Sequence, residues 1–470
     1  MNILFAASEA QPYAASGGLA DVVGSLPKAI CAKGHDCRIV MPLYKSISAE
    51  MREEMTFIAN ITVDVSWRKQ YCGIFTSVKN GITYYFIDNE YYFARDGLYG
   101  FYDDCERFVF LSRAVLEMLR YIDFKPDIIN SNDWQTALIP VYYNVYYKYQ
   151  QGYDQIKNVF TIHNIEYQGK YGKEVLNELM GIPLYHANLL EYDGYINMMK
   201  GAIETADKIV TVSPSYAWEI LDSWYAHGLD RILVTKQHKL LGILNGIDTE
   251  VFDPADDKFI SANYSASKPE NKAKCKKALI KELGLNDDSA PIIGIVTRFV
   301  AHKGIDLIRC VFEEMLECGF KFAVLGSGER IFEDFFREMA ARYPDRVSVT
   351  IGFVPELSHR IYAGADVFLM PSQSEPCGLA QMFAMRYGTI PVVRETGGLR
   401  DTVRDNGGEN GNGFTFKTYN ANDMLDAVKR AKMVYDSPDE WRSLVKRAMT
   451  CNYSWSASAD LYLKMYNELI

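Results

Sequence analysis

Short apolar runs alternate with amphipathic segments along this chain, and the apolar runs end on polar residues. The spacing of apolar residues in "FVFLSRAVLEMLRYI" predicts a helix at 108–122. Strands that alternate with such helices form open parallel sheets, which bind ligands at the carboxyl ends of their strands. In the first half of the chain, the runs with the length and composition of buried strands are 2–8, 35–44, 127–133, 158–169 and 208–215.

A second cycle of the same rhythm begins near residue 291, with strand-like runs such as "PIIGIVTRF", "KFAVLGSGE" and "VFLMPS". The segment between the cycles, about 246–290, is rich in Asp, Lys, Ser and Asn and contains the turn-forming "LNGID" and "FDPADD". We therefore predict an α/β protein with two Rossmann-like, doubly wound domains and a hinge near Asn245–Asp248. The predicted boundaries are 1–244, 245–453 and a separate helix at 454–470.

Composition narrows the function. The chain has 470 residues and a net charge of −10, which disfavours nucleic acid or an anionic membrane as a partner. No apolar run approaches the ~18 residues of a membrane span. The first residues, "MNILFAASEA", lack the features of a signal peptide, and nine cysteines without CxxC pairs favour a reducing compartment, so we expect a cytoplasmic protein. Without HExxH, DxD, P-loop or GxSxG patterns, we expect no metal and no other cofactor.

Two turns share a Gly-Gly-Leu pattern between an expected strand and an expected helix, one at 16–19 and the other at 396–399. Adjacent glycines let a backbone approach a ligand closely, although tight strand-to-helix turns use glycine anyway. The first turn is preceded by Ala15 and contains no cation, so it lacks the charge that an anion site would have.

The stretch "PSQSEPCGLAQ" (371–381) follows an expected strand. Pro376 suits the first turn of a helix. In that case the amides of Cys377, Gly378 and Leu379 are unpaired at the helix N-terminus, where such groups bind phosphate. Glu375 lies just outside, and a carboxylate there is equally consistent with a helix-capping acid.

Further polar groups follow other strands of both cycles. Arg298 and Lys303 stand five residues apart in "TRFVAHKGIDL", where two cations could neutralise a diphosphate without a metal, or simply face solvent. In the first cycle, strand ends carry groups that can hydrogen-bond sugar hydroxyls, although a lone His at a strand end is often structural. These groups are Asn132, Asp133, His163 and Asn164.

Together, in order and spacing, these stretches resemble the bacterial glycogen synthase and plant starch synthase family over essentially the whole chain. The stretches that carry the resemblance are "SGGLADVVGSLPKA", "NDWQTALIP", "FTIHNIEYQG", "KIVTVSPSYAWEI", "GILNGID", "TRFVAHKGIDL", "IGFVPELSHRIYAGADVFLMPSQSEPCGLAQ" and "TGGLRDTV".

This resemblance implies a GT-B glycosyltransferase, in which two Rossmann-like domains face each other across a cleft and close over a nucleotide sugar. It implies transfer of glucose from ADP-glucose to the non-reducing end of an α-1,4-glucan (glycogen, starch or a maltooligosaccharide), with retention and without a metal. Residues 1–244 would be the acceptor domain and 245–453 the nucleotide-sugar domain, and the helix at 454–470 would return to the first domain.

The resemblance also assigns roles to residues. Arg298 and Lys303 would contact the diphosphate, Glu375 would lie by the donor glucose, and Asp21 and His163 would contact the glucosyl unit. Donor-binding residues would be Gly17, Gly18, Asn245, Phe353 (as the ring on the base), Cys377, Gly378, Leu379, Thr396 and Gly397. Acceptor-binding residues would be Asn132, Asp133, Asn164 and Tyr167.

Two departures from the family pattern keep alternatives open. The family commonly has Lys where this chain has Ala15, and Asn130 and Asn132 stand where some members have histidines. The missing cation motivates a glucan-binding or regulatory paralogue with little turnover. The base contacts are not visible in the sequence, so UDP-glucose remains an alternative donor; an epimerase is disfavoured by "NDWQTAL" and "GILNGID". A plant member would act in the plastid stroma, with its transit peptide absent here.

Overall fold

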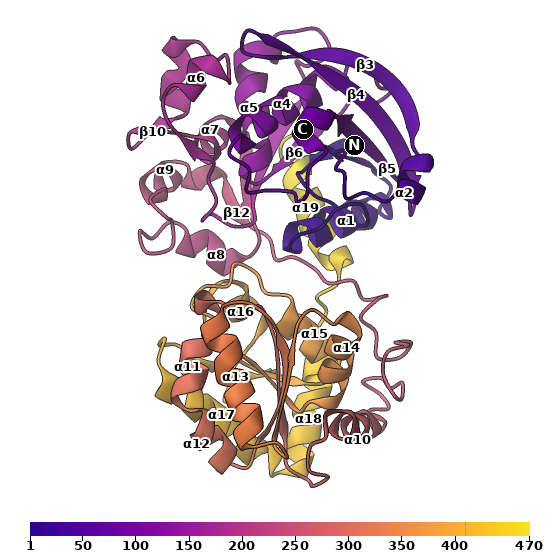
Figure 1. The fold of residues 1–470 in the computed structure, drawn as a ribbon, viewed down its shortest axis with the longest axis vertical. Helices are drawn as coiled ribbons and strands as arrows, with labels where there is room; N and C mark the ends of the chain where they lie inside the picture. Colours follow the sequence, from indigo (N-terminus) through magenta and orange to yellow (C-terminus); the bar gives the residue numbers. More distant parts are fainter. Residues whose placement is uncertain (409) are drawn as a thin grey trace. The chain divides into compact units, whose positions relative to one another are not determined.

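The computed structural model describes residues 1–408 and 410–470, and Figure 1 shows its fold. The chain divides into two compact units. The first unit combines Met1–Gly246 with Trp455–Ile470, and the second unit is Ile247–Ser454. The boundaries expected from the sequence, 244/245 and 453/454, lie one or two residues from these divisions.

The first unit is built on a nine-stranded sheet in the order β12-β11-β7-β6-β1-β2-β5-β4-β3. All neighbours from β12 to β5 are parallel, and only β4 and β3 are added in antiparallel fashion. Its strands are β1 (Asn2–Ala6), β2 (Asp36–Pro42), β3 (Thr56–Val65), β4 (Arg68–Lys79), β5 (Ile82–Asp88), β6 (Ile128–Asn132), β7 (Lys157–Ile162), β11 (Lys208–Thr211) and β12 (Leu240–Gly242).

The strand order of the first unit reverses at β1. The chain runs from β1 through helix α1 to β2 on one side, while β6 pairs with β1 on the other side, with Ala6 opposite Ser131. Such a reversal leaves a crevice at the carboxyl ends of the two strands, where open α/β sheets bind ligands. The residues that follow β1 and β6 therefore emerge side by side.

Helices cover this sheet, and the first unit also contains a separate small antiparallel sheet of β8 (Lys170–Tyr171), β9 (Glu191–Tyr192) and β10 (Tyr195–Asn197). The helices are α1 (Gly18–Cys31), α2 (Ala49–Glu53), α3 (Glu90–Phe93), α4 (Asp104–Met118), α5 (Leu138–Tyr142), α6 (Val175–Glu178), α7 (Met198–Thr205), α8 (Pro214–Glu219), α9 (Asp230–Thr235) and α19 (Trp455–Asn467). Short stretches of 3₁₀ or π helix are η1 (Trp134–Thr136), η2 (Tyr143–Tyr147), η3 (Leu184–Leu189) and η4 (Gln237–Lys239).

The last helix, α19, packs into the first unit against α1 (Figure 1, yellow and indigo). Its buried face includes Tyr462 and Tyr466. The side-chain amide of Asn130 on β6 donates to the Tyr466 hydroxyl at 3.0 Å, and the Ser458 hydroxyl donates to the Leu244 carbonyl at 2.7 Å. The C-terminal segment is thus part of the core that supports β6.

The second unit holds a six-stranded, fully parallel sheet in the order β15-β14-β13-β16-β17-β18. Its order reverses between β13 and β16, which gives this unit its own crevice at the carboxyl ends of those strands. The strands are β13 (Ile292–Val296), β14 (Lys321–Gly326), β15 (Val347–Ile351), β16 (Val367–Met370), β17 (Ile390–Arg394) and β18 (Phe414–Phe416).

Helices lie on both faces of the second sheet (Figure 1), which buries strands such as "KFAVLG" completely. They are α10 (Lys272–Leu283), the 3₁₀ turn η5 (Ala301–Lys303), α11 (Ile305–Cys310), α12 (Phe312–Glu317), α13 (Arg330–Arg342), α14 (Pro355–Gly364), α15 (Ala380–Arg386), α16 (Gly397–Thr402), α17 (Ala421–Tyr435) and α18 (Pro438–Met449).

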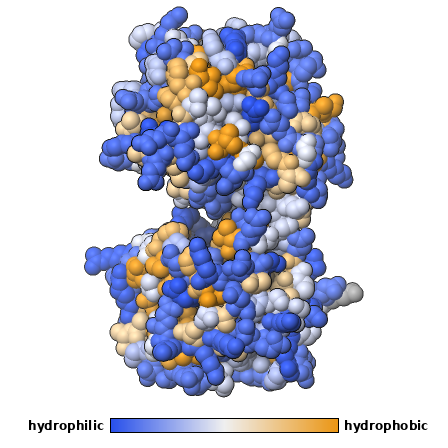
Figure 2. All heavy atoms as spheres, turned by 90° about the vertical axis from the view of Figure 1, so that its right-hand side faces the viewer, coloured by the Kyte–Doolittle hydropathy of each residue, from blue (hydrophilic) through white to orange (hydrophobic). Residues whose placement is uncertain are grey.

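Within the described residues, no helix has the length and apolar character to cross a membrane. On the face drawn in Figure 2, hydrophobic side chains form small groups among hydrophilic ones on each unit.

Candidate functional site

The crevice of the second unit contains an ion pair between two residues predicted from the sequence. Lys303 follows β13 through η5, and Glu375 lies in the loop after β16. The Lys303 Nζ donates to Glu375 Oε2 at 2.6 Å, and the Ser372 hydroxyl donates to the same oxygen at 2.9 Å. Only 7% of Glu375 is exposed. A buried carboxyl group that receives hydrogen bonds from an ammonium and a hydroxyl on one oxygen is held in one orientation.

A glycine brings these two loops together. Gly304, directly after Lys303, has a φ of +75°, and a Cβ there would lie 2.2 Å from the Pro371 carbonyl oxygen. The backbone amide of Gln373 donates to the His302 carbonyl at 2.8 Å. Any side chain at 304 would push the lysine loop away from the loop that carries Glu375. This close packing explains why glycine follows Lys303 in the sequence.

Arg298 lies at the same edge of the sheet, just after β13, and its side chain is exposed. Within residues 1–408 and 410–470, it forms no ion pair or side-chain hydrogen bond. The crevice therefore combines a lysine already paired with Glu375 and an arginine whose guanidinium is available to an anion.

The glycines of the turn at 396–399 allow close packing against another loop of the protein. Added Cβ atoms on Gly397 and Gly398 would lie 2.0 Å from the carbonyl oxygens of Glu375 and Cys377 respectively. The Gly398 amide donates to the Glu375 carbonyl at 3.1 Å. The close approach expected for a ligand is made here by the backbone of the Glu375 loop. Thr396 is buried and occupies the N-cap position of α16.

The helix expected to begin at Pro376 begins later. Helix α15 starts at Ala380, after Leu379 as its N-cap, and has seven residues. Pro376 and Cys377 lie in the preceding loop, where Gly378 has a φ of +70°; the Gln381 side chain donates to the Gly378 carbonyl at 2.9 Å. The expectation of a helix start at Pro376 is wrong, because the loop must first turn back beneath the turn at 396–399. Phosphate binding by the 377–379 amides stays a prediction.

Phe353 follows β15, and 90% of it is exposed. A base can therefore stack on this ring without displacing any side chain. Asn245, in contrast, is buried in the first unit, and its Oδ1 has no hydrogen-bond partner among the described residues. Both roles in donor binding remain predictions.

In the first unit, the turn at 16–19 has empty space around its glycines: a Cβ on Gly17 or Gly18 would meet no atom within 4 Å. The backbone amides of this turn, however, already have a hydrogen-bond acceptor. The carboxylate of Glu9, of which 3% is exposed, accepts hydrogen bonds from the amides of Ser16 and Gly17. Burial raises the pKa of Glu9, an effect that these amides oppose and the nearby Asp21 reinforces. An internal carboxylate thus occupies the anion position before α1.

Sequence reasoning missed Glu9. It stands three residues after β1 in "SEAQP", as Asp133 follows β6, and the adjacency of β1 and β6 was the signal that could have found it. Tyr99 was also missed: its hydroxyl lies 2.7 Å from the Ser8 hydroxyl and close to the carboxyls of Glu9 and Asp133. Asp21 lies in the first turn of α1 and is exposed.

The polar residues after β6 and β7 form one hydrogen-bonded group. Asp133 Oδ1 accepts from the amides of His163 and Asn164, at 2.8 and 3.4 Å. Burial raises the pKa of Asp133 to about 7 and lowers the pKa of His163 to about 3. Asn132 is fully buried, and its side-chain oxygen lies 2.9 Å from His163 Nε2.

The four proposed acceptor residues differ in what they can offer. Both hydrogens of the Asn132 amide are used by carbonyls of the protein, and the Asn164 Oδ1 accepts from the Glu166 amide at 2.9 Å. Tyr167, of which 61% is exposed, is open to solvent. Direct acceptor contact therefore suits Tyr167 better than Asn132.

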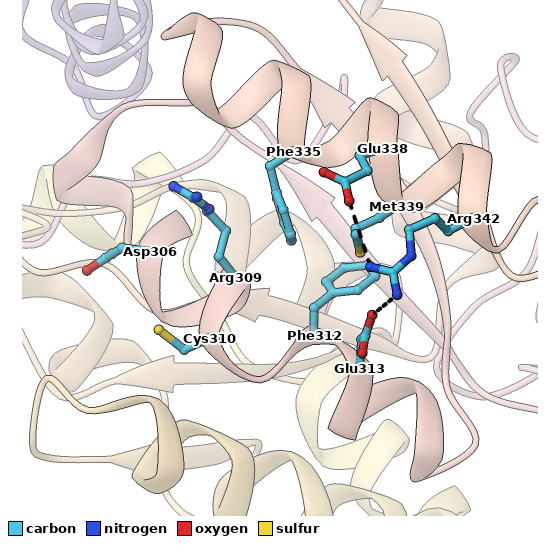
Figure 3. Close-up of a pocket in the computed structure, with 9 residues that line it drawn as sticks. All are labelled: Asp306, Arg309, Cys310, Phe312, Glu313, Phe335, Glu338, Met339 and Arg342. Atoms are coloured by element: carbon cyan, nitrogen blue, oxygen red, sulfur yellow. Dashed lines mark ion pairs between the residues drawn. The ribbon is translucent and has the colours of Figure 1, made fainter.

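A separate pocket of about 460 Å³ lies between α11, α12 and α13 (Figure 3). Arg342 closes one side by ion pairs to Glu313 at 2.5 Å and Glu338 at 3.8 Å. None of the residues predicted from the sequence lines this pocket.

The comparisons with known proteins cover both units. Residues 2–235 match the family model described as starch synthase catalytic domain, and residues 276–446 match that of glycosyl transferases group 1. A glycogen synthase of Geobacillus thermodenitrificans is 48% identical, over 100% of this chain and 98% of its own; one of Bacillus cereus is 48% identical over 100% of both chains. The chain belongs to the glycogen synthase and starch synthase family. The family resemblance read from the sequence is confirmed.

Solved structures of the family and of its fold agree. The catalytic domain of starch synthase IV from Arabidopsis thaliana, bound to ADP and acarbose, superimposes with a TM-score of 0.91 at 35% identity, over 100% of this chain and 99% of that one. A sucrose-phosphate synthase from Thermosynechococcus elongatus, 17% identical with a TM-score of 0.60, shares the fold alone. The predicted GT-B fold is thus confirmed, and the chain is a hexosyltransferase of this family.

Proposed function

We propose that this hexosyltransferase uses ADP-glucose as donor and elongates an α-1,4-glucan. The observation that carries the proposal is the crevice between β13 and β16, where a buried, ion-paired Glu375 stands beside Lys303 and the unpaired Arg298. The starch synthase IV neighbour was solved with ADP, which supports the choice of nucleotide. A cytoplasmic site of action is part of the proposal and is supported by nine free cysteines.

The chemistry follows from the charges. As the bond between the glucosyl carbon and the diphosphate oxygen breaks, the leaving diphosphate gains negative charge and the carbon becomes oxocarbenium-like. Arg298 and Lys303 stabilise the negative charge on the diphosphate, and Glu375 stabilises the positive charge on the glucosyl carbon. The acceptor hydroxyl attacks from the face that the diphosphate leaves, and its proton passes to the departing phosphate oxygen, so configuration is retained.

Two side-chain cations would neutralise the diphosphate without a metal ion. This part of the proposal rests on the residue types at the crevice, since Arg and Lys are phosphate binders in their own right. Full glucosyl transfer in the presence of EDTA supports it, and loss of transfer that a divalent cation restores contradicts it.

Nucleotide release measured side by side from ADP-glucose and UDP-glucose, with glycogen or a maltooligosaccharide as acceptor, tests the function. We expect a higher kcat/KM with ADP-glucose and longer glucan products. A preference for UDP-glucose would replace the donor but keep the reaction. Absence of nucleotide release and of elongation with either donor would favour the regulatory paralogue that Ala15 suggests.

A further inference from the structure

We propose that Asn132 is a positioning residue that holds the hydrogen of the His163 imidazole on Nε2, so that Nδ1 accepts a hydrogen bond from a sugar hydroxyl of the substrate at the crevice of the first unit. This inference rests on the proposed function, because it needs a sugar substrate at the crevice of the first unit.

The orientation of the Asn132 amide is fixed by its partners. Its Nδ2 donates to the carbonyl oxygens of Ala6 and Asn130, each at 3.1 Å. Carbonyl oxygens only accept, so the nitrogen must face them and Oδ1 must face the imidazole. Since an amide oxygen also only accepts, the hydrogen between Oδ1 and His163 Nε2, 2.9 Å apart, belongs to the imidazole.

The imidazole is also held neutral. Burial lowers the pKa of His163 to about 3. The titratable groups brought to this region include Asp133 after β6, Glu9 after β1 and Tyr99 before α4. Tyr216 and Glu219 on α8 and Glu166, three residues after His163, also belong to it. Asp133 gives its Oδ1 to backbone amides and Tyr216 accepts from the Ile165 amide, so the single ring contact recorded for His163 within the described residues is Asn132.

A neutral imidazole with its hydrogen on Nε2 carries a lone pair on Nδ1. This nitrogen can accept from a sugar hydroxyl, whereas an imidazolium could only donate. Asn132 thus acts on the reaction through His163, without contacting the substrate.

The matched pair Asn132→Asp and Asn130→Asp tests this role. Both asparagines are buried on β6, but Asn130 bonds to Tyr466 and Thr161 and not to the imidazole. A carboxylate at 132 stabilises the imidazolium, so Asn132→Asp should lose about tenfold or more of kcat at low pH and recover as His163 deprotonates, with little change in the donor KM. Asn130→Asp should show no such acidic limb. Equal, pH-independent losses in both variants would overturn the proposal.

Imidazole ¹⁵N shifts of the wild-type protein, labelled at histidine, give a readout that does not depend on activity. The His163 signal is assigned by its loss in His163→Gln. We expect one neutral form, with hydrogen on Nε2, from about pH 5.5 to 8.5. A titrating ring, or hydrogen on Nδ1, contradicts the inference even if the enzyme is active. Lack of glucosyl transfer by the wild type would instead remove the proposed function and leave this measurement intact.

Discussion

The turns at 16–19 and 396–399 share a Gly-Gly-Leu sequence and a place between strand and helix, yet they have different surroundings. Around Gly17 and Gly18 there is open space, and the adjacent amides hold the Glu9 carboxylate. Gly397 and Gly398 are pressed against the backbone that carries Glu375. The same local sequence therefore specifies the turn, while the neighbouring strand decides whether a ligand, a side chain or another loop approaches it.

The largest effect should come from the loop that the second turn supports. Glu375→Gln removes the charge facing Lys303 and should lower kcat by about 10²–10³-fold, with a smaller change in donor KM. Nucleotide release measures it, and circular dichroism checks the fold. Ser372→Ala, which removes only one hydrogen bond to the same oxygen, is the matched control and should cost a few-fold at most. Unchanged turnover in Glu375→Gln would contradict the assigned role.

An added methyl group should change the free energy of unfolding in one of the two turns and not in the other. Gly398→Ala places a Cβ 2.0 Å from the Cys377 carbonyl oxygen, and we expect a loss of about 1–3 kcal/mol in the free energy of unfolding. Denaturant titration of the purified variant measures it. Wild-type stability would show that the two loops separate easily, and would remove the contrast drawn between the turns.

The corresponding change in the first turn, Gly17→Ala, should leave stability within about 0.5 kcal/mol of wild type, because nothing lies within 4 Å of the new carbon. If substrate occupies that space, the KM for donor or acceptor should rise several-fold while the unfolding curve stays unchanged. Unchanged kinetics would mean that the open space has no ligand.

Glu9→Gln tests the internal carboxylate of the first turn through pH. Because burial raises its pKa, Glu9 favours the folded state below its ordinary pKa, and that contribution is lost as pH rises through the raised value. The melting temperature of Glu9→Gln relative to wild type should therefore be higher at pH 8 than at pH 5. A difference that is independent of pH, or that runs the other way, would show that Glu9 is not strained as an anion.

Among the kinetic effects, the smallest is expected for Ala15→Lys. Residue 15 is exposed, and the Ser16 amide beside it already holds Glu9, so a new ammonium would share its charge with Glu9 and Asp21. We expect a gain of up to about 1 kcal/mol in donor kcat/KM, which falls with added salt. Ala15→Gln, of similar length without charge, is the control and should show no gain; an equal gain would exclude an electrostatic cause.

The sequence predicted the buried parallel strands well. Short apolar runs such as 2–6 and 292–296, which alternate with amphipathic helices, are typical of buried strands in a parallel sheet. It did not predict β3 and β4, whose pairing depends on an antiparallel partner, or the break between α11 and α12 at Val311, inside a continuous helical pattern. Lys303 and Glu375 were found because their motifs are local. Glu9 was not, since its role arises from β6 beside β1 and from a turn seven residues away.

The position of α19 has a consequence for the order of synthesis. Tyr466 supports Asn130, which in turn receives the Thr161 hydroxyl at 2.9 Å, so the core under β6 and β7 includes a helix made more than 200 residues after Gly246. A nascent chain can complete the Ile247–Ser454 unit while the first unit still waits for its last helix. During translation, the polar group around His163 is therefore among the last parts of the protein to gain its final support.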